Sequence, residues 1–283
     1  MIWGNQRNRM PEKRCVMAGK FEGMLICSDF DGTLFSENQI SEENVSAIRY
    51  FQENGGYFTI TSGRYPEFLG KFRARVEANT YLIGLNGTII SNYDGTSVLR
   101  RGFLQPKAGE VVKKIICGVE GISAMSFSTT EIPAPIKQHC EAPEGEGYFR
   151  YLLKKHSEEL LDIALSCDIY RIIFHTVEDA DEKITNAMRE IAGADYAISR
   201  SYARGIELQN VAYTKGTSAR YLANHLGVHT LICVGDYEND ISMVQEADIG
   251  CAVSNAIPEM LRVADRILPA VDKHPFSELI ASL

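Results

Sequence analysis

The sequence predicts an α/β protein with a Rossmann-like parallel-sheet core, helices on both faces of that sheet, and an inserted α+β cap domain. Two observations support this fold class. Short apolar runs typical of buried strands alternate with helical patterns, as a parallel sheet with crossover helices requires. These runs lie at 24–28, 57–61, 81–85, 230–234 and 249–253. Between about residues 88 and 203 the pattern changes, and strand-like segments stand among helical stretches.

The first helix of the core is predicted from its ends and its apolar face. Ser41 is a suitable N-cap residue. Val45, Ile48 and Phe51 follow at spacings that place them on one side of a helix. Gly55-Gly56 would then end the helix.

Three parts of the chain are predicted: an N-terminal extension at 1–23, a core at 24–87 and 204–283, and the inserted cap domain at 88–203. Hinges are expected near Gly87 and Arg204-Gly205. The first 23 residues carry basic side chains without an apolar segment, so a secretory signal is not expected. Met17 and Met24 are candidate starts of the protein.

Within the inserted part, strands are predicted from Ile122 to Ser128 and from Ile169 to His175, where apolar and β-branched residues gather. Helices are predicted from the spacing of the apolar residues, at about 108–117, 149–163 and 181–192. The insertion is therefore expected to form a mixed sheet-and-helix unit of its own.

Composition excludes several classes of protein. The formal net charge is −8 and no long basic run offsets it, which argues against a general nucleic-acid or anionic-membrane surface. No apolar stretch approaches the roughly 18 residues that a membrane span needs. The seven cysteines are an odd number without a C-x-x-C pair, so we expect free thiols in a reducing compartment. These observations predict a cytoplasmic protein without nucleic-acid or membrane partners.

The most informative motif is Asp29-Phe30-Asp31-Gly32-Thr33, directly after the first apolar run. Side chains two apart on a strand point the same way, so Asp29 and Asp31 can converge on one ligand if the strand runs to its end. One carboxylate can attack phosphorus while the other transfers a proton. The alternative is an acidic turn, in which Asp and Gly are common.

Two further segments supply groups that suit a phosphate. Thr61-Ser62-Gly63-Arg64 follows the second apolar run and offers a hydroxyl and backbone N–H groups at a strand end. Lys215 precedes a helical pattern from Ser218 to Leu226 that Gly227 would close, and a lysine beside a helix N-terminus favours an anion. Either segment alone is equally consistent with a turn or a solvated lysine.

A cluster of polar residues, Gly235-Asp236-Tyr237-Glu238-Asn239-Asp240, follows the apolar run 230–234. Acidic residues placed after a buried strand are costly unless they are paired or bound to a cation. Carboxylate oxygens are the ligands that Mg²⁺ prefers. A helix N-terminus, which welcomes acidic residues, would account for Glu238 or Asp240 but not for Asp236 at the strand end.

With its four motifs in this order, the sequence resembles the haloacid dehalogenase-like phosphatase superfamily, and within it the Cof-type branch with a large α/β cap. The resemblance spans residues 24–283, and Asn86-Gly87 is similar to the family segment that leads into the cap. Val253-Ser254 departs from a family stretch that often has Met-Gly before Asn-Ala. The resemblance implies no catalytic role for Val253 or Ser254.

The resemblance implies a role for each motif residue. Asp29 would be the nucleophile, Asp31 the general acid and base, and Lys215 a catalytic residue that also binds phosphate. The remaining phosphate-binding residues would be Ser62, where threonine is more usual, Gly63 and Asn239. Mg²⁺ would be held by Asp29, the Asp31 backbone carbonyl and Asp236, with Asp240 in the secondary shell.

The expected function is a Mg²⁺-dependent phosphatase that hydrolyses a small phosphorylated metabolite through an aspartyl-phosphate. The resemblance favours sugar phosphates. Two alternatives stay open, a phosphomutase or phosphotransferase of the same superfamily and a non-catalytic phosphate-binding regulator. No role is assigned to candidate contacts in the cap, which are His139, Arg150, His156, Tyr170 and His175. The sequence does not predict the oligomeric state.

Overall fold

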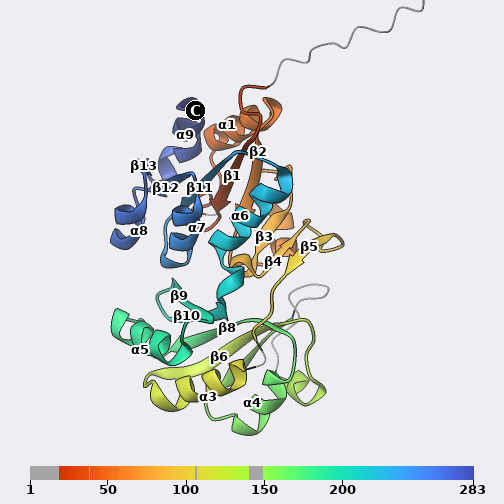
Figure 1. Ribbon diagram of the computed structural model, residues 1–283, viewed down its shortest axis with the longest axis vertical. Coiled ribbons are helices and arrows are strands. Elements are labelled where there is room, and N and C mark those ends of the chain that lie inside the picture. Colours follow the sequence, from red (N-terminus) through yellow and green to blue (C-terminus); the bar gives the residue numbers. More distant parts are fainter. Residues whose placement is uncertain (1–18, 38, 106, 140–148) are drawn as a thin grey trace, which may run out of the picture.

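A computed structural model of the chain describes residues 19–37, 39–105, 107–139 and 149–283. Within these residues the chain forms one sheet of eight strands and one of five. Figure 1 shows the larger sheet at one end of the molecule, built from both ends of the described chain, and the smaller sheet at the other end. The predicted fold class, a parallel-sheet α/β core with a second α+β part, is confirmed.

The strands of the larger sheet are β1 (Met24–Asp29), β2 (Tyr57–Thr61), β3 (Leu82–Gly84), β4 (Ile89–Ser91), β5 (Val98–Arg101), β11 (Thr230–Gly235), β12 (Ile249–Val253) and β13 (Arg266–Leu268). Their order is β13-β12-β11-β1-β2-β3-β4-β5. Pairing is parallel from β13 to β3 and antiparallel between β3, β4 and β5. Because β1 lies between β11 and β2, the strand order reverses there, and such a switch point forms a ligand-binding crevice at the carboxyl ends of the strands.

Helices cover both faces of this sheet. They are α1 (Glu42–Glu53), α2 (Pro66–Leu69), α6 (Lys215–Leu226), α7 (Ile241–Glu246), α8 (Pro258–Val263) and α9 (Pro275–Ala281). Ile26 packs into an apolar cluster with α1, α8 and α9, whereas its neighbours Leu25 and Cys27 pack on the opposite face with α6 and α7. The continuous apolar run of β1 is therefore explained by burial on both faces.

The prediction of the first helix is confirmed by α1. The Ser41 side chain accepts a hydrogen bond from a backbone N–H in the first turn. Val45, Ile48 and Phe51 are all buried against the sheet. Gly55 follows the helix with a φ of +93°, a left-handed conformation that glycine adopts without strain.

The smaller sheet belongs to the cap. Its strands are β6 (Ile122–Thr129), β7 (Phe149–Lys154), β8 (Ile169–Thr176), β9 (Tyr196–Tyr202) and β10 (Gly205–Asn210). They are antiparallel in the order β7-β6-β8-β10-β9. Helices α3 (Ala108–Gly118), α4 (Glu158–Leu165) and α5 (Glu182–Ala192) share an apolar cluster with one face of this sheet.

Alternation along β8 gives the cap sheet two different faces. Ile172 and Phe174 point into the apolar cluster under the helices. Arg171 and Ile173 line a cavity that also contains residues of the core. The face of the cap sheet that carries no helix is therefore turned toward the core, and it bears charged side chains.

The predicted helix at 149–163 is wrong. Residues 149–154 form the edge strand β7, which pairs with β6, and a helix begins only at Glu158. Tyr151 and Leu153 are both buried, at the two-residue spacing of a strand. The apolar residues of β7 and α4 follow one another closely in sequence, so together they resemble the pattern of a single helix. Pairing with β6 makes the first part a strand.

The predicted boundaries of the cap do not coincide with the two sheets. Strands β4 and β5 lie within 88–203 but pair with the core sheet, and β10 lies within 204–283 but pairs with the cap sheet. The chain thus passes from the core sheet to the cap after β5 and returns after β10. Whether the two parts fold independently stays a prediction.

Residues 19–23, predicted as part of an extension, pack on the core. Phe21 is fully buried, and its ring lies 4.8 Å from that of Phe51 between centroids. Its backbone N–H donates a 3.0 Å hydrogen bond to the Asn54 carbonyl. The remainder of the predicted extension, 1–18, lies outside the described residues. Of the described helices, none is long and apolar enough to span a membrane.

Candidate active site

The predicted motifs meet at the carboxyl edge of the core sheet. Asp29 is the last residue of β1 and is paired in register with Thr61, the last residue of β2. Gly235 ends the neighbouring strand β11, so Asp236 leaves the same edge. Lys215 is the first residue of α6, whose N-cap is Thr214. Parallel strands place their carboxyl ends together, which explains why segments so distant in sequence converge.

A buried ionic group forms the floor of the site. The Lys215 ammonium donates to Asp29 Oδ1 at 2.6 Å and to Asp240 Oδ1 at 2.5 Å. Lys215 and Asp240 are each 1% exposed and Asp29 is 6% exposed. The other oxygen of Asp240 accepts from the backbone N–H groups of Asp236 and Tyr237, both at 3.2 Å. Each buried charge therefore has partners, as burial of charge requires.

The pKa values of this group are shifted by burial and by its neighbours. Burial raises the pKa of Asp29 well above its usual range, Asp240 adds to the rise, and Lys215 opposes it. Burial alone would lower the pKa of Lys215, but the two carboxylates outweigh it and the pKa is raised, so the ammonium stays charged. Burial and Asp240 also raise the pKa of Asp236, to about 6.

Three carboxylates gather at this point. Oxygen atoms of Asp29, Asp236 and Asp240 lie within 4.8 Å of one another. The Thr33 hydroxyl donates to Asp236 Oδ1 at 2.7 Å and orients it. Gly32 has a φ of +86°, and a Cβ there would lie 2.7 Å from Asp236 Oδ2, so glycine is required for the close approach. With a single lysine between them, these three carboxylates leave an excess of negative charge that a divalent cation would balance.

Asp31 lies apart from this group. Its two carboxylate oxygens accept from Nε and Nη2 of Arg64, both at 2.7 Å, and its side chain is about half exposed. The strand ends at Asp29, so the two-residue alternation does not carry Asp31 into the buried cluster. Asp29 and Asp31 nevertheless line the same cavity. Arg64, to which sequence reasoning gave no role, also stacks on Phe68 with 4.3 Å from its guanidinium carbon to the ring centroid.

The loop after β2 is held by the cap. Ser62 is buried, and its hydroxyl accepts a 3.1 Å hydrogen bond from the backbone N–H of Arg64. The Gly63 carbonyl accepts from Arg171 Nη2 of β8 at 2.6 Å. Arg171 also binds both carboxylate oxygens of Glu207, at 2.7 and 2.8 Å. Neither Arg171 nor Glu207 was predicted, because no local pattern marks a residue that acts across two sheets.

Asn86 connects this network to the fourth motif. Its amide nitrogen donates to Glu207 at 2.6 Å, and its amide oxygen accepts from Asn239 at 3.1 Å. Its backbone is left-handed, with φ 54° and ψ 34°. Asparagine tolerates that conformation better than most residues, which fits its place at the bend after β3. The structure thus brings together Asp29, Ser62, Gly63, Lys215, Asp236, Asn239 and Asp240, with Asp31 at the edge of the same site.

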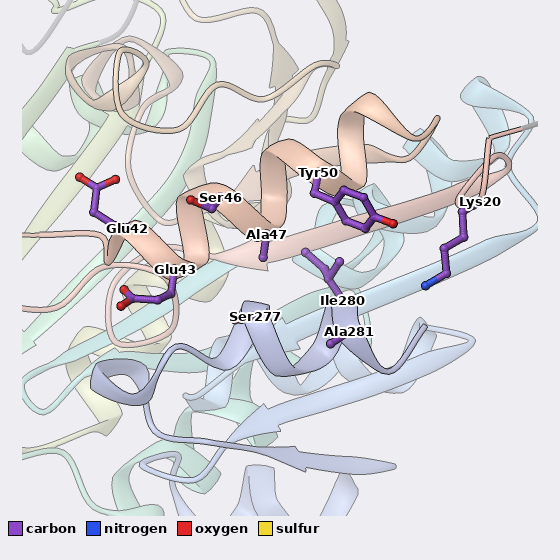
Figure 2. A pocket seen from close by; sticks show the side chains of 9 residues that line it. All are labelled: Lys20, Glu42, Glu43, Ser46, Ala47, Tyr50, Ser277, Ile280 and Ala281. Atoms are coloured by element: carbon purple, nitrogen blue, oxygen red, sulfur yellow. The ribbon is translucent and has the colours of Figure 1, made fainter.

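A cavity of about 690 Å³ lies over these residues. Asp29, Asp31 and Asp236 belong to its core wall, and Arg150 and Tyr202 to its cap wall. A second hollow of similar volume lies between α1 and α9 (Figure 2), but it contains none of the motif residues. The chemistry of the motif residues identifies the first cavity as the candidate active site.

Comparison with protein families decides the assignment. A family described as haloacid dehalogenase-like hydrolase matches residues 26–280. The chain belongs to this family. The resemblance to the haloacid dehalogenase-like superfamily seen in the sequence is confirmed, and a hydrolase is what the family predicts.

Individual relatives are distant but cover almost the whole chain. Phosphatase YwpJ of Bacillus subtilis is 23% identical over 92% of this chain and 99% of its own. A phosphoglycolate phosphatase of Methanospirillum hungatei is 26% identical over 85% of this chain and 88% of its own. Among solved structures, BT1666 of Bacteroides thetaiotaomicron superimposes with a TM-score of 0.71 at 19% identity, covering 95% and 98% of the two chains. The subclass IIB sugar phosphatase BT4131 gives a TM-score of 0.69 at 18% identity, covering 92% and 98%. Because the matches cover nearly the whole chain, the fold shared with these structures includes the cap as well as the core.

Proposed function

We propose that the protein is a Mg²⁺-dependent phosphatase that hydrolyses a small phosphorylated metabolite, a sugar phosphate or similar phosphomonoester, through an aspartyl-phosphate intermediate. The observation that carries the proposal is the buried group of Asp29, Lys215, Asp236 and Asp240 at the floor of a cavity. Membership of a hydrolase family supports the reaction class, and the names of the relatives support a phosphate ester as substrate.

The residues present fit a magnesium ion. Their donors are carboxylate oxygens, and Mg²⁺ prefers such hard ligands. At an effective dielectric near 20, two unit charges about 4 Å apart interact by about 4 kcal/mol, so a phosphate dianion beside one carboxylate meets about 8 kcal/mol of repulsion. Mg²⁺ held by Asp29, Asp236 and the Asp31 carbonyl would supply the positive charge that offsets this repulsion.

Asp29 is suited to attack phosphorus. Lys215 binds its Oδ1, which leaves Oδ2 to form the bond to phosphorus while the bond from phosphorus to the leaving oxygen breaks. Lys215 then lies beside the transferred group and stabilises charge on its oxygens. Ser62 uses its lone pair to accept from Arg64, so its own proton can be donated to a phosphate oxygen.

Asp31 is assigned the proton transfers. It would protonate the leaving oxygen in the first step and take a proton from the attacking water in the second, when the aspartyl-phosphate is hydrolysed. In the structure both of its oxygens are engaged by Arg64. Asp31 can therefore transfer a proton to the leaving oxygen only after substrate entry has separated it from Arg64. The Arg64–Asp31 ion pair should accordingly be broken when the site is occupied.

The test is release of phosphate by purified protein with MgCl₂, on p-nitrophenyl phosphate and a panel of sugar phosphates. Asp29→Asn is the matched control, because it removes the nucleophile and changes the shape little. In water enriched in ¹⁸O, the label should appear in the released phosphate. Turnover retained by Asp29→Asn would contradict the mechanism. Isomerised sugar phosphate without free phosphate would instead favour the phosphomutase alternative.

A further inference from the structure

A further hollow, distinct from the one between α1 and α9, adjoins the catalytic cavity and is lined mainly by cationic and aromatic side chains. Its volume is about 470 Å³, and it lies between the segment after β2 and the cap. Four of its lining residues are cationic and two are aromatic: Arg64, Lys71, Arg150, Arg171, Tyr65 and Phe68. We call these six residues the basic hollow. Among the described residues that line it, none is acidic, although the chain as a whole has a formal charge of −8.

The basic hollow is continuous with the catalytic cavity. Gly63, Arg64, Arg150 and Arg171 line both spaces. Arg64 contacts Asp31, the proposed general acid, at 2.7 Å. A molecule whose phosphoryl group faces the catalytic carboxylates therefore has a direct route past Arg64 into this hollow.

Part of the positive charge is explained by internal pairing and part is not. The partner of Arg64 is Asp31 and the partner of Arg171 is Glu207, and both carboxylates lie on the catalytic side. Lys71 is exposed, and it makes no ion pair with any residue that the structure describes. Lys71 lines the basic hollow but not the catalytic cavity, so its positive charge faces the hollow without a described carboxylate partner.

One aromatic ring holds two of these cations in place. The Arg64 guanidinium carbon lies 4.3 Å and the Lys71 ammonium nitrogen 4.6 Å from the ring centroid of Phe68. Phe68 and Lys71 are three residues apart across a helical turn, a spacing that puts them on the same side. Cation–π contact orients both side chains, but it does not neutralise the charge of Lys71. An anion placed in the hollow would neutralise it.

We propose that the basic hollow binds a second anionic group of the substrate, a carboxylate or a further phosphate, while the first phosphate faces Asp29. This rests on the proposed function and narrows it to phosphomonoesters that carry another negative charge. Lys71 and Arg150 are the residues expected to contact the second anion, with Arg64 lying between the two anionic groups.

The experiment compares two pairs of substrates that differ in a second anion: glycerol 3-phosphate against 3-phosphoglycerate, and fructose 6-phosphate against fructose 1,6-bisphosphate. For wild type, kcat/KM should be higher for the member that carries the second anionic group in at least one pair, and the pair that responds distinguishes carboxylate from phosphate. Lys71→Gln and Arg150→Gln should each reduce that preference about ten- to a hundredfold, the range expected for loss of one hydrogen bond to a charged group. Lys114→Gln, at an exposed position of α3, is the matched control and should leave the preference intact.

The outcomes separate this inference from the proposed function. p-Nitrophenyl phosphate has no second anion, so its hydrolysis by wild type reports the phosphatase reaction alone. Hydrolysis of p-nitrophenyl phosphate without preference for either substrate that carries a second anionic group would overturn the inference and leave the function standing. An equal fall on both members of a pair in Lys71→Gln would also overturn it. If Arg150→Gln does not fold, the exposed Lys71 still provides the test.

Discussion

The sharpest prediction of stability concerns the buried ion pair of Arg171 and Glu207. The two side chains are 7% and 2% exposed, and they join neighbouring strands of the cap sheet on the face turned to the core. Arg171 donates two hydrogen bonds to Glu207 and one to the Gly63 carbonyl. Replacing Arg171 by Met leaves the Glu207 carboxylate buried with a single remaining side-chain donor, Asn86.

The expected cost follows from that exposure. Removing one partner of a buried pair costs about 3–5 kcal/mol, because a charge is left without compensation. The whole free energy of unfolding of a typical protein is only about 5–15 kcal/mol. Arg171→Met should therefore lower the stability of the cap by a large fraction. The chain also offers an exposed comparison, Arg204 with Asp179, whose side chains are 62% and 72% exposed. A surface pair of that kind contributes about 0–1 kcal/mol.

The assay is urea unfolding followed by circular dichroism and by a fluorescent probe in the cap, since a chain with two apolar cores need not unfold in one step. Arg171→Met should shift the cap transition strongly and Arg204→Met hardly at all. Adding Glu207→Gln to Arg171→Met should restore part of the loss, because the amide is neutral and can still accept from Asn86. A shift for Arg171→Met no larger than that for Arg204→Met would refute the reasoning.

Further predictions concern chemistry. In rapid-quench experiments Asp31→Asn should slow the first step, formation of the aspartyl-phosphate, by about 10²–10⁴ with alkyl phosphates but much less with p-nitrophenyl phosphate, since nitrophenolate leaves without a proton. Steady-state turnover should fall on both substrates, because Asp31 is also the proposed base for the shared second step; equal losses in the first step would exclude Asp31 as the acid. Asp29→Asn should inactivate on both substrates. Chelation should abolish turnover, and Asp236→Asn should need more Mg²⁺ than wild type in a titration of activity; an unchanged requirement would exclude it as a ligand. Iodoacetamide at pH 8 should label exposed Cys117 but not Cys251, whose pKa burial raises to about 12, as peptide mass spectrometry can check.

Much of the core and most of the site could be predicted because their signals are local. Each core strand is a short apolar run, and each motif stands directly after one. The register of β1 with β2 pairs Asp29 with Thr61, so the ends of these runs meet once the strands are parallel. The local patterns do not show that the strand order reverses at β1. That reversal, which brings the motifs to one crevice, follows only from the predicted fold class.

The rest depends on contacts between distant segments. Asn86 and Glu207 are 121 residues apart, and Gly63 and Arg171 are 108 apart, so no pattern in either neighbourhood reports the bond. The edge strand β7 was missed for a similar reason, since its pairing with β6 decides its conformation. Asp31 shows the limit of strand alternation, because β1 ends at Asp29 and the side chain turns to Arg64 instead.

The cap contacts the core through polar bonds to loops of the candidate active site. Arg171 binds the carbonyl of Gly63, next to Ser62, and Arg189 and Arg200 both pair with Glu238, next to Asn239. The main apolar clusters of the two sheets are separate, and only a small cluster that includes Tyr170 and core residues joins them. A polar interface of this kind favours relative motion of the two parts over permanent association. Because the bonds end on residues adjacent to the proposed phosphate ligands, a shift of the cap that keeps these bonds would also move those ligands. The position of the cap and the geometry of the phosphate site are therefore coupled through the same side chains.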